Sequence, residues 1–148
     1  MTKVLVVDDE PTIATLLADI IEDHGYEVTI AFDGRQGYEL AKSGKFKLVI
    51  TDIMMPHVSG KELCSQLKHE PAAQDTQVVL MSAVAHLAHL GNNCEADAFI
   101  LKPFDISVIT QIIERFLTVP DTIHHTFPAP GLNNHSYTTH NENNFRGN

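Results

Sequence analysis

Basic residues and long apolar runs are scarce in this sequence. Only 10 of its 148 residues are Lys or Arg, against 19 Asp or Glu, so the net charge at pH 7 is −9. Nucleic-acid binding depends on Lys and Arg meeting phosphates, so this balance argues against direct contact with nucleic acid and against a membrane-binding surface. No apolar stretch approaches the roughly 20 residues that cross a bilayer, and the N-terminus leads into a predicted strand rather than a signal peptide. We therefore expect a cytoplasmic protein.

Cysteine and glycine are absent where two classes of site would need them. The two cysteines, Cys64 and Cys94, lack a metal-binding spacing, and we expect both to be free thiols. The first predicted strand is followed by Asp-Asp-Glu-Pro, where a dinucleotide-binding fold requires a glycine-rich loop. The sequence therefore argues against a dinucleotide-dependent oxidoreductase.

Acidic residues follow two predicted strands directly. The run Leu48–Thr51 is apolar and β-branched, as in a strand buried on both faces, and it leads into Asp52. The run Lys3–Val7 leads in the same way into Asp8 and Asp9. A single aspartate at a strand end can simply cap the following turn. Three carboxylates at one edge of a parallel sheet repel one another unless a cation joins them, and Mg²⁺ suits such a site.

Two further strands end in polar side chains. Val78–Met81 is followed by Ser82, and Ile100 and Leu101 are followed by Lys102. In an open α/β sheet, ligands bind outside the carboxyl ends of the strands. Carboxylates, a hydroxyl and an ammonium at this edge predict a site that can hold a phosphoryl group on Asp52.

The strands alternate with helices, which predicts an α/β fold with a parallel sheet and helices on both faces. Predicted helices cover Pro11–His24, Gly34–Lys42, Ser59–His69 and Val84–Gly91, and a last helix is capped by Asp105. Strands complete the pattern at Glu27–Ala31 and Ala98–Leu101. The first helix has a predicted buried stripe of Ile13, Leu16, Leu17, Ile20 and Ile21, and the last has one of Ile106, Ile109, Ile113, Phe116 and Leu117.

Four short motifs resemble the response-regulator receiver domain of two-component signalling. They are VVDDEP at Val6–Pro11, TDIMMP at Thr51–Pro56, MSA at Met81–Ala83 and FILKPF at Phe99–Phe104. They occur in the order of the family, and the resemblance covers roughly residues 2–118. It implies a flavodoxin-like sheet of five strands in the order 2-1-3-4-5, and a cis peptide bond before Pro103.

The resemblance also implies a set of site residues. Asp52 would be the phosphoacceptor, and Asp8, Asp9, Asp52 and the backbone carbonyl of Met54 would bind Mg²⁺.

Ser82 and Lys102 would contact the phosphoryl oxygens, and Phe99 would be the aromatic switch residue. The segment between Ser82 and Lys102 departs from the family, because it is slightly short and has Glu95 where a glycine is common. In the predicted helix there, His86 and His89 have a spacing compatible with a metal pair, but surface histidines are the simpler interpretation.

Receiver domains take a phosphoryl group from a histidine kinase or histidine phosphotransfer protein, and they signal by binding a downstream protein or by onward relay. They catalyse only their own phosphorylation and dephosphorylation, so we do not expect an enzyme. The alternative is a Mg²⁺-dependent phosphohydrolase with an aspartyl nucleophile. Such enzymes usually carry a second acid two residues later, where this chain has Met54.

The C-terminal segment differs in composition. Residues 120–148 contain six Asn, four His and three Pro, with only three charged residues and no hydrophobic period. Such a segment cannot form a core. We therefore expect a receiver domain over residues 1–119 and a flexible tail over residues 120–148.

Overall fold

The computed structural model describes residues 1–83 and 95–118. The strands are β1 (Lys3–Val7), β2 (Glu27–Ala31), β3 (Leu48–Asp52), β4 (Gln77–Ser82) and β5 (Ala98–Leu101). The helices are α1 (Pro11–Asp23), α2 (Gly34–Ala41), α3 (Gly60–Lys68), the short 3₁₀ helix η1 (Pro71–Ala73) and α5 (Ile106–Phe116). The predicted helix Val84–Gly91, with His86 and His89, lies outside the described residues. None of the helices within the described ranges is long and apolar enough to cross a membrane.

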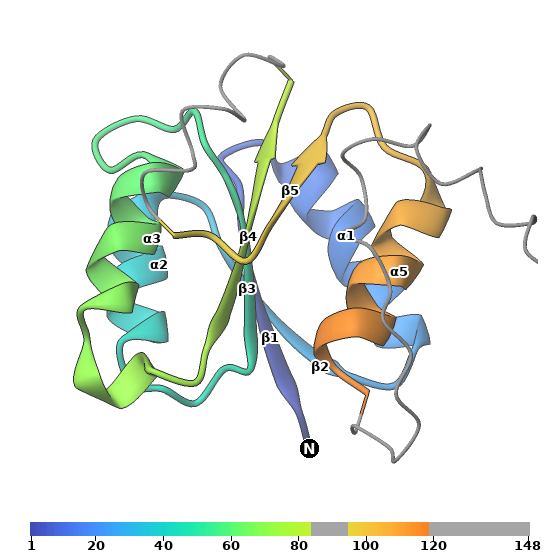
Figure 1. Cartoon of the computed structure of the whole chain (residues 1–148). Helices are drawn as coiled ribbons and strands as arrows, with labels where there is room; N and C mark the ends of the chain where they lie inside the picture. The colour runs from blue at the N-terminus through green and yellow to red at the C-terminus, as the bar shows by residue number, and fades with distance from the viewer. Residues whose placement is uncertain (84–94, 119–148) are drawn as a thin grey trace, which may run out of the picture.

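All five strands are parallel and form one sheet in the order β2-β1-β3-β4-β5, which confirms the predicted fold class. Helices α1 and α5 cover one face of the sheet, and α2 and α3 cover the other (Figure 1). Each face has its own apolar core, and β3 is buried along its whole length. Because β3 and β1 lie inside the sheet, the acids at their ends meet at its carboxyl edge.

Both predicted apolar stripes contain one residue that the structure places at the surface. Leu16 in α1 is 46% exposed and Ile106 in α5 is 62% exposed, so these two assignments were wrong. Ala14 and Ala18 of α1 take part in the buried face instead, and Ile112 does so in α5. The buried face of α1 is thus made partly of alanines, and Leu16 lies outside it.

The helix starts were predicted with mixed success. Ser59, the predicted start of the third helix, caps α3 with its side chain and forms a capping box with Glu62. Asp105 occupies the N-cap position of α5, but its side chain makes no capping hydrogen bond. Asp33 caps α2 by accepting a hydrogen bond from the amide of Gln36 at 2.8 Å.

Candidate functional site

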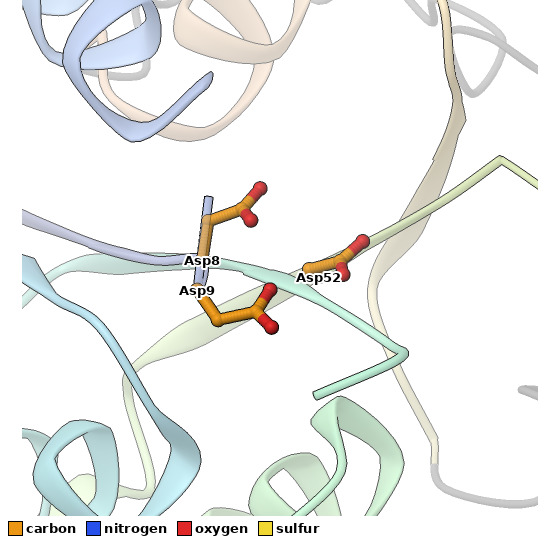
Figure 2. A group of neighbouring side chains, drawn as sticks. All are labelled: Asp8, Asp9 and Asp52. Carbon is orange, nitrogen blue, oxygen red and sulfur yellow. The ribbon is translucent and has the colours of Figure 1, made fainter. Parts of the chain in front are cut away.

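Three carboxylates meet at the carboxyl edge of the two central strands. Asp52 is the last residue of β3, and Asp8 and Asp9 directly follow β1. The strands are hydrogen-bonded neighbours in a register that pairs Val7 with Thr51, so both chains leave the sheet at the same level. One oxygen from each carboxylate lies within 4.8 Å of the others (Figure 2). The three acids singled out from the sequence therefore form one cluster.

Asp8 is held in a fixed orientation at the base of this cluster. Its side chain is only 1% exposed, and its Oδ1 accepts a hydrogen bond from the amide of Glu10 at 2.9 Å. Its Oδ2 accepts a hydrogen bond from Lys102 Nζ at 3.2 Å. Asp9, by contrast, is exposed to solvent. The cluster thus combines an oriented, buried carboxylate with one that remains free to meet an incoming ion.

Lys102 joins the acids of both strands. Its ammonium lies 3.1 Å from Asp52 Oδ1 and 3.2 Å from Asp8 Oδ2, and only 15% of its side chain is exposed. The backbone amide of Lys102 donates to the carbonyl of Ser82 at 2.9 Å, which holds the end of β5 against β4. The Lys102–Pro103 peptide bond is cis, as the resemblance implied.

The electrostatics of the cluster are set by burial and by these charges. Burial raises the pKa of Asp52 above its usual value, Lys102 opposes this rise, and the nearby acids Asp8 and Asp9 reinforce it. Burial disfavours the ammonium of Lys102, but Asp52 and Asp8 outweigh this and hold the pKa of Lys102 above its usual value. A divalent cation among the acids would favour the ionised form of Asp52.

The loop after Asp52 is fixed at its first residue. The amide of Ile53 donates to the carbonyl of Met81, and its carbonyl accepts from the amide of Gly60, both at 2.9 Å. A Cβ atom on Gly60 would collide with the carbonyl oxygen of Asp52, so only glycine fits there. Met54 follows in this loop with a side chain that is 62% exposed. Two residues after Asp52 there is thus a solvent-facing methionine instead of an acid.

Ser82 and Phe99 lie on the strands next to the cluster. Ser82 is the last residue of β4 and is 2% exposed. Phe99 in β5 is 8% exposed and packs into the core on the α2 and α3 face of the sheet. The structure therefore places Ser82 at the same edge of the sheet as the acids. Phe99 lies in the neighbouring strand β5, with its side chain in the core.

Two positions that matter for Asp52 were missed by the sequence analysis. Thr51 is fully buried, and its Oγ1 donates to the carbonyl of Asp52 at 3.0 Å. Gly60 allows the start of α3 to approach that same carbonyl. Thr51 was interpreted only as a strand former and Gly60 only as part of a helix start. A glycine inside a capping box was the one signal that indicated a close backbone approach.

The donor set fits a hard divalent cation. The cluster offers carboxylate oxygens from three residues, one of them exposed, and these are the ligands that Mg²⁺ prefers. Within the described part of the chain this is the one group of three or more potential metal ligands. Lys102 neutralises part of the charge of Asp8 and Asp52, so the acids can lie together before an ion binds.

Comparison with known proteins agrees with this geometry. The family described as the response regulator receiver domain matches residues 4–114. The response regulator ArlR of Staphylococcus saprophyticus is 34% identical over 119 residues, which cover 79% of this chain and 53% of ArlR. The chain thus spans about half the length of this curated relative.

Solved structures show the same fold. The response regulator TrrA of Thermotoga maritima, in complex with Mg²⁺-BeF, is 32% identical with a TM-score of 0.71, over 79% of this chain and 100% of that chain. The chemotaxis response regulator CheY4 of Vibrio cholerae is 28% identical with a TM-score of 0.72, over 79% of this chain and 99% of that chain. With its fold, its strand-end acids and its sequence all in agreement, the chain belongs to the response regulator receiver domain family.

Proposed function

We propose that this chain accepts a phosphoryl group on Asp52 from a histidine kinase or a histidine phosphotransfer protein. It then signals by phosphorylation-dependent binding of a downstream protein or by onward relay, and it works in the cytoplasm. The observation that carries the proposal is the position of Asp52, a buried carboxylate between the ammonium of Lys102 and the oxygens of Asp8 and Asp9.

Mg²⁺ would be held by Asp8, Asp9, Asp52 and the backbone carbonyl of Met54. When bound, the ion supplies positive charge to the phosphoryl oxygens and keeps Asp52 ionised. Asp8 suits this role because its two hydrogen bonds fix its orientation before any ligand arrives. Asp9 suits it because its exposure leaves it open to an ion from solvent.

In the transfer step, a carboxylate oxygen of Asp52 attacks phosphorus in line, and the bond from phosphorus to the donor histidine breaks as the new bond forms. Charge on the transferred oxygens is the main quantity that a protein can stabilise in such a reaction. Lys102 is placed for this task, because its ammonium lies 3.1 Å from Asp52 Oδ1. Hydrolysis by water would later release phosphate.

Ser82 and Phe99 would carry the signal away from the site. The phosphoryl group adds about −1.5 to −2 charges and strong acceptor oxygens. The hydroxyl of Ser82, at the end of β4, would bind one of these oxygens. Phe99 would then change its rotamer within the neighbouring strand, which alters the surface that partner proteins contact.

A protein is favoured over a small molecule as the physiological phosphodonor because apolar side chains are exposed beyond the carboxyl ends of the strands, the edge of the sheet where the acids lie. Phe32, Met54 and Ile106 follow β2, β3 and β5 and are 45%, 62% and 62% exposed. Leu16 is also exposed and lines a shallow hollow on α1. Exposed apolar groups beside a charged centre are typical of protein contact surfaces, whose core is apolar and whose rim is polar.

The competing function is that of a Mg²⁺-dependent phosphohydrolase. This chain has the exposed Met54 at the position where such an enzyme usually has its second acid. The two functions are separated by incubating the full chain with Mg²⁺ and either a phosphorylated histidine kinase or a phosphate ester such as p-nitrophenyl phosphate. A receiver accepts one phosphoryl group per chain from the kinase and does not turn over the ester. Many turnovers of the ester that depend on Asp52 would instead establish the hydrolase.

The division into a receiver domain over residues 1–119 and a tail over residues 120–148 is also part of the proposal. Residues 119–148 lie outside the described residues. A chain that ends at residue 119 should melt within about 4 °C of the full chain, since roughly 1 kcal/mol shifts the melting temperature of a domain of this size by that amount. A larger loss would show that residues 120–148 contribute to the folded domain.

A further inference from the structure

Strand β5 leads directly into Lys102, but it is the shortest strand of the sheet. It has only four residues, lies at the edge and pairs with β4 alone (Figure 1). Lys102 must nevertheless lie within hydrogen-bonding distance of both Asp52 and Asp8, at 3.1 and 3.2 Å. A shift of β5 by two residues preserves which side chains face each core but moves Lys102 by roughly 7 Å, which separates it from both acids.

Asp97, the residue before β5, fixes the other end of this strand. Its Oδ2 accepts a hydrogen bond from Lys68 Nζ at 2.8 Å and another from the amide of Val78 at 2.8 Å. Its own amide donates to the carbonyl of Val78, also at 2.8 Å. Three short contacts therefore tie the start of β5 to the start of β4 and to the last residue of α3.

The Lys68–Asp97 ion pair is partly shielded from water. The two side chains are 18% and 26% exposed, whereas those of the ion pair between Lys42 and Glu39, at 2.9 Å, are 45% and 59% exposed. Shielded pairs with additional hydrogen bonds contribute more to stability than exposed pairs do. Any shift of β5 along β4 would remove the Asp97 carboxylate from both donors at once.

We propose that Lys68 and Asp97 are positioning residues for the phosphorylation site, which act by holding β5 in the register that presents Lys102 to Asp52. The edge strand is then anchored at both ends, at its start by Asp97 and at its end by Lys102. The significance of Lys102 rests on the proposed function, but the anchoring of β5 does not. It can therefore be tested without a phosphodonor.

The test is native-state hydrogen exchange of the full chain, and two backbone amides serve as probes. The amide of Asp97 bonds to Val78 beside the ion pair, and the amide of Lys102 bonds to Ser82 at the opposite end of β5. In Lys68→Met, we expect both amides to exchange about tenfold faster than in the original chain, the ratio that corresponds to about 1.4 kcal/mol. The amides of β1 lie in a central strand that opens only with the whole fold, so any change in their rates should match the loss of global stability in the same variant.

Lys42→Met is the matched control, because it removes a lysine from an ion pair of similar length that is exposed. Both probe amides should exchange at unchanged rates in this variant, and Lys68→Arg should restore protection by keeping the charge. Faster exchange at Asp97 with an unchanged rate at Lys102 would overturn the proposal, since the ion pair would then act only locally.

A double-mutant cycle supplies a second measurement. Distant, independent sites have additive effects on stability, whereas coupled sites do not. If β5 links the two anchors, Lys68→Met combined with Lys102→Met should lose less stability than the sum of the single variants. Strict additivity would contradict the linkage, even if phosphorylation of Asp52 itself were observed.

Discussion

Lys102 Nζ lies 3.1 Å from Asp52 Oδ1, although β4 separates the strands that carry these two residues. The lysine side chain therefore crosses the end of β4 and places its positive charge beside the buried carboxylate at the end of β3. It lies 3.2 Å from Asp8 on the next strand as well. The negative charge of the cluster is partly balanced in this way, and the remainder is available to a divalent cation.

The raised pKa of Asp52 makes stability depend on pH. Because the pKa is raised in the folded state, the folded protein holds this proton more tightly than the unfolded chain does. The contribution of Asp52 to stability therefore falls as the pH rises from its usual pKa of about 3.9 through the raised value, and it stays low above that. At pH 7 without Mg²⁺, Asp52→Asn should therefore melt at a higher temperature than the original chain.

Two comparisons check the direction of this change in melting temperature. Below about pH 3.9 the carboxyl is neutral in both states, so the advantage of Asp52→Asn should vanish. With saturating Mg²⁺ at pH 7 it should also shrink or reverse, since the ion favours the carboxylate. An Asn variant that melts lower than the original chain at pH 7 in the presence of a chelator would contradict the assigned direction.

Mg²⁺ should stabilise the folded chain at neutral pH by relieving repulsion among the three acids. At a concentration ten times its dissociation constant, a ligand that binds only the folded state adds about 1.4 kcal/mol, or roughly 6 °C in melting temperature. Asp9→Asn should lose most of this rise with little effect on the metal-free melt, because Asp9 is exposed. Differential scanning calorimetry with and without Mg²⁺ measures both, and a melt indifferent to millimolar Mg²⁺ would refute metal binding here.

Lys102→Ala and Ser82→Ala should affect different steps. Loss of Lys102 removes positive charge from the transferred oxygens, so phosphorylation by a small phosphodonor should slow about tenfold or more. Loss of the Ser82 hydroxyl should leave phosphorylation within a few-fold of the original rate but uncouple it from partner binding. Quench-flow phosphorylation together with a binding assay distinguishes them, and Ser82→Ala with normal phosphorylation-dependent binding would refute this division of roles.

Glu95 has a left-handed backbone with φ of 63°, a conformation that favours glycine. Glu95→Gly should therefore stabilise the fold by up to about 1 kcal/mol, because the relief of strain exceeds the entropy that glycine loses on folding. Glu95→Gln is the control, since it removes the charge but keeps the Cβ atom, and it should leave the melting temperature unchanged. Equal stabilisation by both variants would show that charge, rather than backbone strain, matters at this position.

Much of the site could be predicted because it depends on local pattern and topology. A buried apolar run indicates a central strand, and the residue after it must lie at the carboxyl edge. This places Asp52 and Asp8 correctly without any knowledge of side-chain contacts. Local conformation also explains why a glycine is common in the family where this chain has Glu95. The backbone there is left-handed, a conformation that glycine adopts without strain.

The contacts that refine the site could not be predicted, because their partners are distant in sequence. Lys102 and Asp8 are 94 positions apart, and Lys68 and Asp97 are 29 apart. Helical periodicity also indicates which side of a helix is apolar, but not how far the buried surface extends around the helix. It could therefore not show that Leu16 would remain exposed. Such details depend on how closely a helix approaches the sheet, which is a property of the packed structure.

Locating the phosphoryl group is the most direct test of phosphorylation at Asp52. The full chain is incubated with acetyl phosphate and Mg²⁺, the acyl phosphate is trapped by borohydride reduction, and the modified residue is mapped by mass spectrometry. We predict a single modified residue, Asp52, with no product in Asp52→Asn or in the presence of a chelator. A stable acyl phosphate on any other residue, or undiminished modification of Asp52→Asn, would contradict it.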